Sequence, residues 1–260
     1  MASYRIWKGT GFNGQSAFAA LTVGTANTKL ADKTTGKLVD SITILSDSAH
    51  PVEAVKSGQD ETVCGDCPMR PLLAKAAKAK GLDAPECYVN KLTGGPGGLW
   101  KAREKMEGME AYNALIAKGK RWLLRFGAYG EPVLLGSALV AELIKGYRMH
   151  TGYTHQWRRA DNAWAAGYFM ASVASAEERM QAKQLGYRTF RVAPLGTTPE
   201  PGEVVCPASA SNSEADKKTC SRCPVACNGN KPGKRMPDIL EYDHGPGSLV
   251  RNAVRRKVTG

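Results

Sequence analysis

From about residue 100 onward, apolar runs alternate with amphipathic stretches along the chain. The runs RWLLRF (121–126), FMASV (169–173) and YRTFRV (187–192) are typical of buried strands. The segments LLGSALVAELIKGY (134–147) and AEERMQAKQLG (176–186) repeat apolar residues at the spacing of amphipathic helices. This βαβ succession predicts a parallel sheet with crossover helices.

The flanking segments predict further elements. Residues 1–50 alternate short β-prone runs with turn residues, and DSITILS (40–46) is one of these strands. HPVEAVKSG (50–58) predicts a short helix with proline near its start and glycine at its end. LWKAREKMEGMEAYNALIAKG (99–119) predicts one helix, and SLVRNAVRRKV (248–258), in the Pro/Gly-rich tail, a short basic helix.

These elements predict an α/β fold: a (β/α) barrel-like or partial-barrel arrangement of parallel strands, with cysteine-rich metal- or cluster-binding loops. We divide the chain into three segments: a β-rich segment with CxxC…C (1–100), a βα core (101–200), and a cysteine-cluster loop with a basic tail (201–260). We expect them to form one compact domain. Half of a barrel and a small open sheet are both compatible with the pattern.

In either architecture, reactive groups belong at the carboxyl ends of the parallel strands. The loops GAYGEP (127–132) and TGYTHQWRR (151–159) are predicted there, and the second places Tyr, His, Gln, Trp and two Arg within seven residues. Glu131 is the candidate general acid or base, His155 a candidate proton carrier near neutral pH, and Tyr129 a further catalytic candidate.

The same loops supply candidate nucleic-acid contacts. Arginines would hold phosphate, and Tyr129, Tyr153 or Trp157 would stack on an extruded base. An alternative for the arginine on the first strand is an ion pair with Glu131 across the turn. The candidate binding residues are Arg125, Gln156, Trp157, Arg158 and Arg159.

Charge and composition narrow the class of protein. The 260 residues carry a net charge of +12, which favours a polyanionic partner: we expect nucleic acid, with DNA favoured over RNA. A solvated basic surface without a partner is the alternative. No apolar run approaches the ~18 residues that span a bilayer, and the N-terminus lacks the features of a secretory signal. We therefore expect a cytoplasmic protein with no membrane partner.

Four of the seven cysteines cluster near the C-terminus. They are spaced Cys206-x13-Cys220-x2-Cys223-x3-Cys227. An odd cysteine count in a reducing compartment disfavours a disulfide framework, so metal binding is the better interpretation. Four thiolates suit either zinc or a [4Fe–4S] cluster, and three thiols within eight residues favour the cluster.

The other three cysteines form a second set, Cys64-x2-Cys67-x19-Cys87. They could hold a cluster with one open iron, or zinc completed by water or a histidine, with His50 the nearest candidate. Two alternatives stay open: CxxC as a structural clip, and all seven thiols as neighbours in space. The nearby GGPGG (94–98) predicts a weak anion cradle.

Several motifs together carry a resemblance: CGDCPMR, ECYVN, RFGAYGEP, TGYTHQWR, YRTFRV, CPAS and KTCSRCPVACNG. From about residue 40 to 230 the chain resembles an uncharacterised family of phage- and plasmid-borne proteins. It is more distantly similar to phage proteins related to radical-SAM enzymes, although their CxxxCxxC motif is absent. A thiol site after a barrel also resembles the layout of tRNA-guanine transglycosylases and their phage DNA-modifying relatives, whose CxCxxC…H motif is not matched residue by residue.

Three functions follow from these sequence features as hypotheses. The first is a phage-type enzyme that modifies nucleic-acid bases and carries an iron–sulfur cluster or zinc. The second is a non-catalytic, metal-stapled protein that binds nucleic acid or a host factor. The third is DNA modification similar to that by guanine or 7-deazaguanine transglycosylases.

Overall fold

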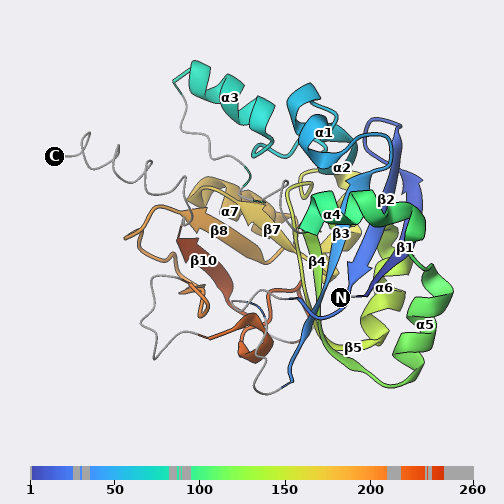
Figure 1. Ribbon diagram of the computed structural model, residues 1–260. Coiled ribbons are helices and arrows are strands. Elements are labelled where there is room, and N and C mark those ends of the chain that lie inside the picture. Colours follow the sequence, from blue (N-terminus) through green and yellow to red (C-terminus); the bar gives the residue numbers. More distant parts are fainter. Residues whose placement is uncertain are drawn as a thin grey trace.

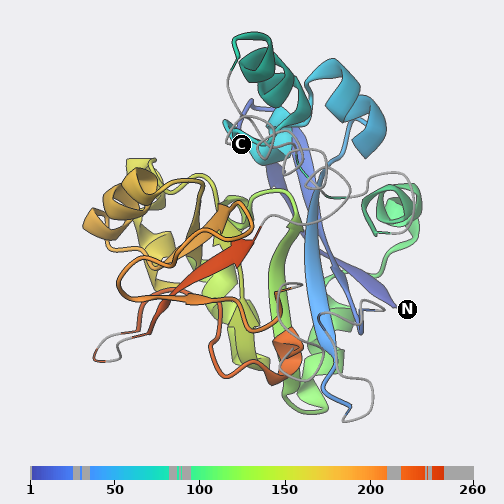
Figure 2. The same ribbon diagram turned by 90° about the vertical axis from the view of Figure 1, so that its left-hand side faces the viewer.

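The computed structural model contains two five-stranded sheets with helices packed around them (Figures 1 and 2). Among the described residues, no helix combines the length and the apolar character needed to cross a bilayer. The structure describes residues 2–25, 30, 36–81, 87, 89, 95–209, 218–231, 233 and 236–242.

The first sheet has the strand order β1-β2-β3-β4-β5. Its first three strands pair antiparallel, and the last three pair parallel. Strands β2 and β3 are buried along most of their length, because they lie in the interior of the sheet. The strands are β1 (Ser3–Thr10), β2 (Ser16–Thr22), β3 (Val39–Ser46), β4 (Arg121–Tyr129) and β5 (Tyr147–Thr151).

The second sheet has the order β6-β7-β8-β10-β9, and every pairing in it is parallel. Helix α7 (Ala176–Gln184) packs on β7 and β8, and its N-terminus is capped by Ser175 Oγ, which accepts from Glu178 N. The strands are β6 (Tyr153–Thr154), β7 (Met170–Val173), β8 (Thr189–Ala193), β9 (Glu203–Val205) and β10 (Asp238–Tyr242).

The remaining helices are short and mostly connect the strands. Helix α1 shows the expected local signals, since proline opens it and Gly58 ends it with a φ of 81°. The helices are α1 (Pro51–Ser57), α2 (Glu61–Cys64), α3 (Pro71–Ala79), α4 (Gly95–Ala102), α5 (Met109–Ala117) and α6 (Gly136–Lys145), with 3-10 turns η1 (Arg103–Lys105), η2 (Pro132–Leu135), η3 (Ala160–Gly167) and η4 (Cys220–Arg222).

The two sheets are joined by Gly152, the single residue between β5 and β6. Its N–H donates to Cys227 O at 3.0 Å, and its carbonyl accepts from Met170 N at 3.1 Å. A Cβ at this position would lie 2.7 Å from Phe169 Cδ1 and 3.0 Å from Phe126 Cβ. The strand therefore changes sheets where only glycine fits.

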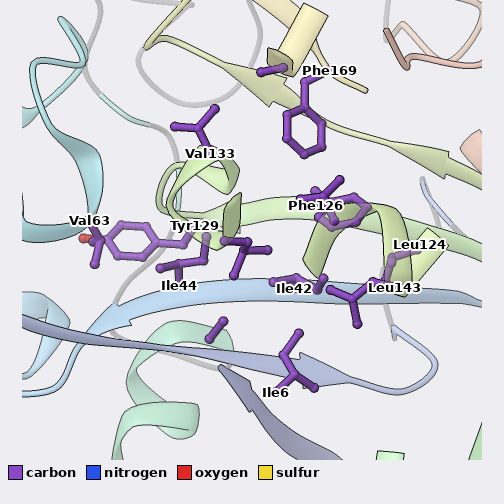
Figure 3. Close-up of a cluster of buried hydrophobic side chains, with 14 of the residues drawn as sticks. Ile6, Ile42, Ile44, Val63, Leu124, Phe126, Tyr129, Val133, Leu143 and Phe169 are labelled. Atoms are coloured by element: carbon purple, nitrogen blue, oxygen red, sulfur yellow. The ribbon is translucent and has the colours of Figure 1, made fainter. Parts of the chain in front are cut away.

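One hydrophobic core extends over both sheets. Figure 3 shows Ile42 and Ile44 of β3 beside Leu124 and Phe126 of β4. Phe169, which precedes β7, packs on Phe126 with ring centroids 5.2 Å apart. Because the core is continuous, the carboxyl ends of strands from different sheets are held together.

Most of the expected elements form, and the α/β class with parallel strands is confirmed. The described strands make two open sheets and no closed barrel. β4, from the predicted βα core, pairs with β3 of the N-terminal segment. β10, from the predicted tail segment, pairs with β8 of the core. The three predicted segments therefore contribute strands to the same two sheets.

Three local predictions need correction. The expected helix at 99–119 is split into α4 and α5, because Gly108 adopts an extended conformation before α5. The Pro/Gly-rich tail contains the inner strand β10, of which Asp238, Ile239, Leu240 and Glu241 are buried. Gly95–Gly98 form the first turn of α4 instead of an open loop. The expected basic helix at 248–258 lies outside the described residues.

Gly152→Ala tests the join between the sheets. We expect the added methyl group to overpack Phe126 and Phe169 and to lower the free energy of unfolding by about 1–3 kcal/mol. Gly167→Ala is the matched control, since a Cβ there meets no atom within 4 Å. Urea denaturation measures both variants. Equal urea-denaturation midpoints for Gly152→Ala and Gly167→Ala would contradict the conclusion that only glycine fits at the join.

Candidate metal centre

The Cys64–Cys67 loop is held in place by a buried arginine. Arg70 donates to Gly65 O at 2.8 Å and to Gly58 O at 2.7 Å, and it forms an ion pair with Asp60 at 3.1 Å. Both charged side chains are buried. A guanidinium presents several donors in a rigid fork, so this one side chain ties Gly65 in the loop to the Gly58–Asp60 segment before α2.

The loop also contacts the end of β6 closely. Gln156 Nε2 donates to Cys64 O at 3.0 Å. Gly65 has a φ of 56°, and a Cβ there would lie 2.9 Å from Gln156 Oε1. Glycine is therefore required in CGDC both for its backbone conformation and for this contact.

Glu131 and His155 follow the carboxyl ends of β4 and β6, at the sheet edge where the sequence predicts reactive groups. Glu131 N donates to Val63 O at 2.8 Å, which places the CxxC loop against this edge. The Glu131 carboxylate accepts from Thr154 Oγ1 at 2.8 Å and from His155 N at 3.1 Å. Its Oε1 lies 2.9 Å from His155 Nδ1.

Cys67, Glu131 and His155 each place one ligand-type atom within 4.8 Å of the other two. Among the described residues, no other three Cys, His, Asp or Glu side chains converge in this way. The Nε2 atom of His155 is buried and makes no hydrogen bond of standard geometry in the described part of the chain, although Cys67 lies near enough to act on the ring through a side-chain hydrogen bond. A buried ring nitrogen without a partner is costly, and a metal ion would satisfy it.

The electrostatics of this group favour a cation. Burial alone would lower the pKa of His155, but the negative charges of Cys67 and Glu131 raise it well above its usual range. Burial, followed by the charges of Cys67 and Glu131, raises the pKa of Cys64. A divalent ion would relieve the repulsion among these anionic groups.

Two further expected residues line the same centre. Burial and then the charges of Cys64, Asp60 and Cys87 raise the pKa of Tyr129, whose ring is buried and points toward Val63 in Figure 3. The charge of Cys87 also acts on Cys64. Cys64, Cys87 and Tyr129 therefore lie close enough for their charges to act on one another.

The donor set fits zinc. Cys sulfur and His nitrogen are ordinary zinc ligands and a neighbouring carboxylate commonly orients the histidine, whereas a [4Fe–4S] cluster is usually held by four thiolates. His155, and not His50, is the histidine of this centre. His50 Nδ1 instead accepts from Val52 N at the start of α1, and its ring packs edge-on against Trp100.

Two of the expected nucleic-acid contacts have structural positions instead. Trp157 is buried and donates through Nε1 to Ser172 O at 3.1 Å. Gln156 is buried against the CxxC loop. Neither side chain is positioned to stack on or bind a base, because the core already surrounds both.

The three candidate arginines differ in their surroundings. Arg158 pairs with Glu178 at 2.7 Å, and Arg159 pairs with Asp161 at 2.9 Å; both remain largely exposed. Arg125 is half-buried on β4, where its charge opposes the burial that raises the pKa of Tyr153. In the described residues Glu131 pairs with His155, so the alternative of an Arg125–Glu131 ion pair is not observed.

The C-terminal cysteines lie elsewhere, on the side of β6 that carries Tyr153. The Cys227 carbonyl accepts from Gly152 N at 3.0 Å and from Thr151 Oγ1 at 2.9 Å. All seven cysteines are thiols and none forms a disulfide. The two cysteine sets therefore do not merge into one site.

Arg70→Met tests how the CxxC loop is held. Removing one partner of a buried ion pair costs about 3–5 kcal/mol and should free the loop. We expect faster alkylation of Cys67, measured by mass spectrometry, together with a lower denaturation midpoint. Arg159→Met, which breaks an exposed pair, is the control and should change neither. Unchanged alkylation in Arg70→Met would show that other contacts fix the loop.

No protein-family model, characterised protein or solved structure matches this chain. The resemblance to a family of phage- and plasmid-borne proteins therefore stays a prediction.

Proposed function

We propose that the protein is a zinc-dependent enzyme that modifies bases in nucleic acid. The observation that carries this proposal is the convergence of Cys67, Glu131 and His155 at the carboxyl edge of a parallel sheet. Cys67 and His155 would be ligands, with Cys64 or Cys87 completing the set. This arrangement leaves room for an open position, as catalytic zinc sites require.

Glu131 has two roles in this proposal. Through its contact with His155 Nδ1 it orients the ring, so that Nε2 is the nitrogen that binds metal. As a buried carboxylate beside the centre, it can also accept a proton and return it. A bound zinc ion supplies Lewis-acid chemistry at the open position.

The ligand types match a known kind of base chemistry. Zinc deaminases use His and Cys ligands with a nearby glutamate that is not a ligand and acts as general acid and base. His155, Cys67 and Glu131 are of the same types, although their order along the chain does not follow the deaminase motif. The proposal therefore rests on the donor set and its geometry.

Charge near the centre supports a nucleic-acid substrate. Lys75, Lys78 and Lys80 are exposed on and just after α3, the helix that follows the CxxC loop. Arg158 and Arg159 lie at the edge that also carries His155. Together with the net charge of +12, these side chains would attract a phosphate backbone.

One observation favours the second hypothesis, a non-catalytic metal-stapled binding protein. Both carboxylate oxygens of Glu131 accept hydrogen bonds, from Thr154 and from His155. In that case the ion would only tie the CxxC loop to the sheet edge. The two functions differ in whether Glu131 is needed for chemistry or only for metal affinity.

Metal analysis of purified variants tests the centre. We expect about one zinc per chain at this site in the wild type and its loss in Cys67→Ser and His155→Ala. Glu131→Gln should retain zinc with about 10–100-fold lower affinity, because it acts through His155. His50→Ala is the matched control and should keep wild-type zinc. Zinc retained by both ligand variants would contradict the proposed centre.

Nucleoside analysis tests the reaction. DNA and RNA incubated with zinc-loaded protein would be digested and their nucleosides separated by mass spectrometry. We expect a modified base with the wild type and none with zinc-saturated Glu131→Gln. A zinc-bound wild type that binds nucleic acid but modifies neither DNA nor RNA would support the non-catalytic alternative.

A further inference from the structure

The turn between β1 and β2 (11–15) packs directly on α2, the helix that ends at Cys64. Phe12 N donates to Thr62 O at 3.0 Å. A Cβ at Gly11 would lie 2.1 Å from the same carbonyl oxygen, so this close approach requires glycine. Because Thr62 is fully buried, the turn has a fixed position beside the CxxC loop, and the half-buried Phe12 ring is held there.

The loop after β6 (155–159) reaches the same turn. Arg159 Cζ lies 5.6 Å from the centre of the Phe12 ring, within the range of a cation–π contact. Arg159 N donates to Gln156 O at 3.2 Å, and Gln156 Nε2 donates to Cys64 O at 3.0 Å. The turn, the CxxC loop and the loop after β6 therefore meet beside the candidate zinc centre.

The neighbouring arginine lies on an indole ring. Arg158 Cζ is 3.8 Å from the centre of the Trp157 ring, and Trp157 is only 2% exposed. The guanidinium group therefore covers the ring on one side. The Arg158 side chain is itself 49% exposed, so its other side faces solvent. Trp157 does not contact a ligand in this arrangement, but it supports a flat cation that does.

Carboxylates hold both guanidinium groups by their edges. Arg159 donates from Nε and Nη2 to the two carboxylate oxygens of Asp161, at 3.2 and 2.9 Å. Arg158 Nη2 donates to Glu178 Oε1 at 2.7 Å. A guanidinium donates hydrogen bonds in its own plane, so these pairs leave the flat faces available for stacking. Because the side chains are already held, less conformational entropy is lost when a ligand binds.

The depth of the candidate centre restricts which nucleic acid can reach it. Cys67 is 8% exposed, Glu131 is 4% exposed, and the side chain of His155 is 23% exposed. A base inside a duplex cannot approach such atoms, so the target base has to leave the stack. In a single strand no base pair has to be broken, and the bases beside the target are available to stack on flat side chains.

We infer that the substrate is single-stranded nucleic acid, and that the guanidinium planes of Arg158 and Arg159 form a platform on which the bases next to the target base stack. The inference rests on the proposed function, because it places the platform beside a base-modifying centre. It assigns the two arginines to bases as well as to phosphates. Every base has a flat face, so such a platform accepts different sequences.

Fluorescence anisotropy with zinc-loaded full-length protein tests the preference for single strands. The probes are a short labelled strand of mixed sequence, prepared as DNA and as RNA, the corresponding duplexes, and an abasic DNA strand that keeps every phosphate. We expect a single strand to bind about 10-fold or more tightly than the duplex and the abasic strand, since stacking of one base changes affinity by about 5–150-fold. This preference with either sugar supports the inference. Equal binding of all probes, or tighter binding of the duplexes, would overturn it.

Two variants that keep the positive charge separate stacking from phosphate binding. Arg158→Lys and Arg159→Lys each remove a flat group, and each should weaken binding of the single strand by about 5-fold or more. Binding of the abasic strand and the salt dependence should not change, because the phosphate contacts are kept. Arg148→Lys is the matched control, since Arg148 is exposed and lies 5.9 Å from the Trp122 ring near the amino end of β5. Equal losses for the single and abasic strands would overturn the assignment of the arginines.

The outcomes also separate the platform from the proposed reaction. A wild type that modifies a base but binds the single, duplex and abasic strands equally would overturn the platform alone. Binding that depends on the bases, without any modified base, would support the platform and contradict the proposed enzyme. Circular dichroism identifies a lysine variant that does not fold. In that case the comparison of single and abasic strands with the wild type still decides the question.

Discussion

The two sheets meet at Gly152, and the rest of the structure depends on how closely the chain passes through this point. Its backbone bonds at once to the Cys227 loop and to the start of β7, while Phe126 and Phe169 close over the position of the missing side chain. Immediately afterwards β6 sends Tyr153 to one side and Thr154 to the other. A single short strand thus lies between both thiol sets.

The buried charged side chains beside the CxxC loop and the adjoining sheet edge have specific partners. Arg70 and Asp60 fix the CxxC loop, and Glu131 holds His155. Burying such groups costs more free energy than their attraction returns unless hydrogen bonds satisfy them, so their presence points to function more than to stability.

Much of the candidate site was predictable from local chemistry. Glu131 and His155 follow strand ends, where parallel sheets place reactive groups, and CxxC spacing points to metal. The interpretation of TGYTHQWRR was only partly right, because a cluster of polar and aromatic residues does not reveal which side chains face inward. Trp157 and Gln156 turned out to fill the interior, and the structural role of Arg70 had no recognisable signal in the sequence.

By itself, the sequence determined the succession of strands and helices, the α/β class and the two sets of cysteines, since periodicity and spacing are local properties. Only the tertiary structure decided that the strands form two open sheets, that DILEY in the tail is an inner strand, and that His155, not His50, lies beside Cys67. The physical reason is that these outcomes depend on contacts between segments far apart in the sequence. The pairing of β10 with β8 and the contact of the CxxC loop with Glu131 both form because the segments pack on a shared core.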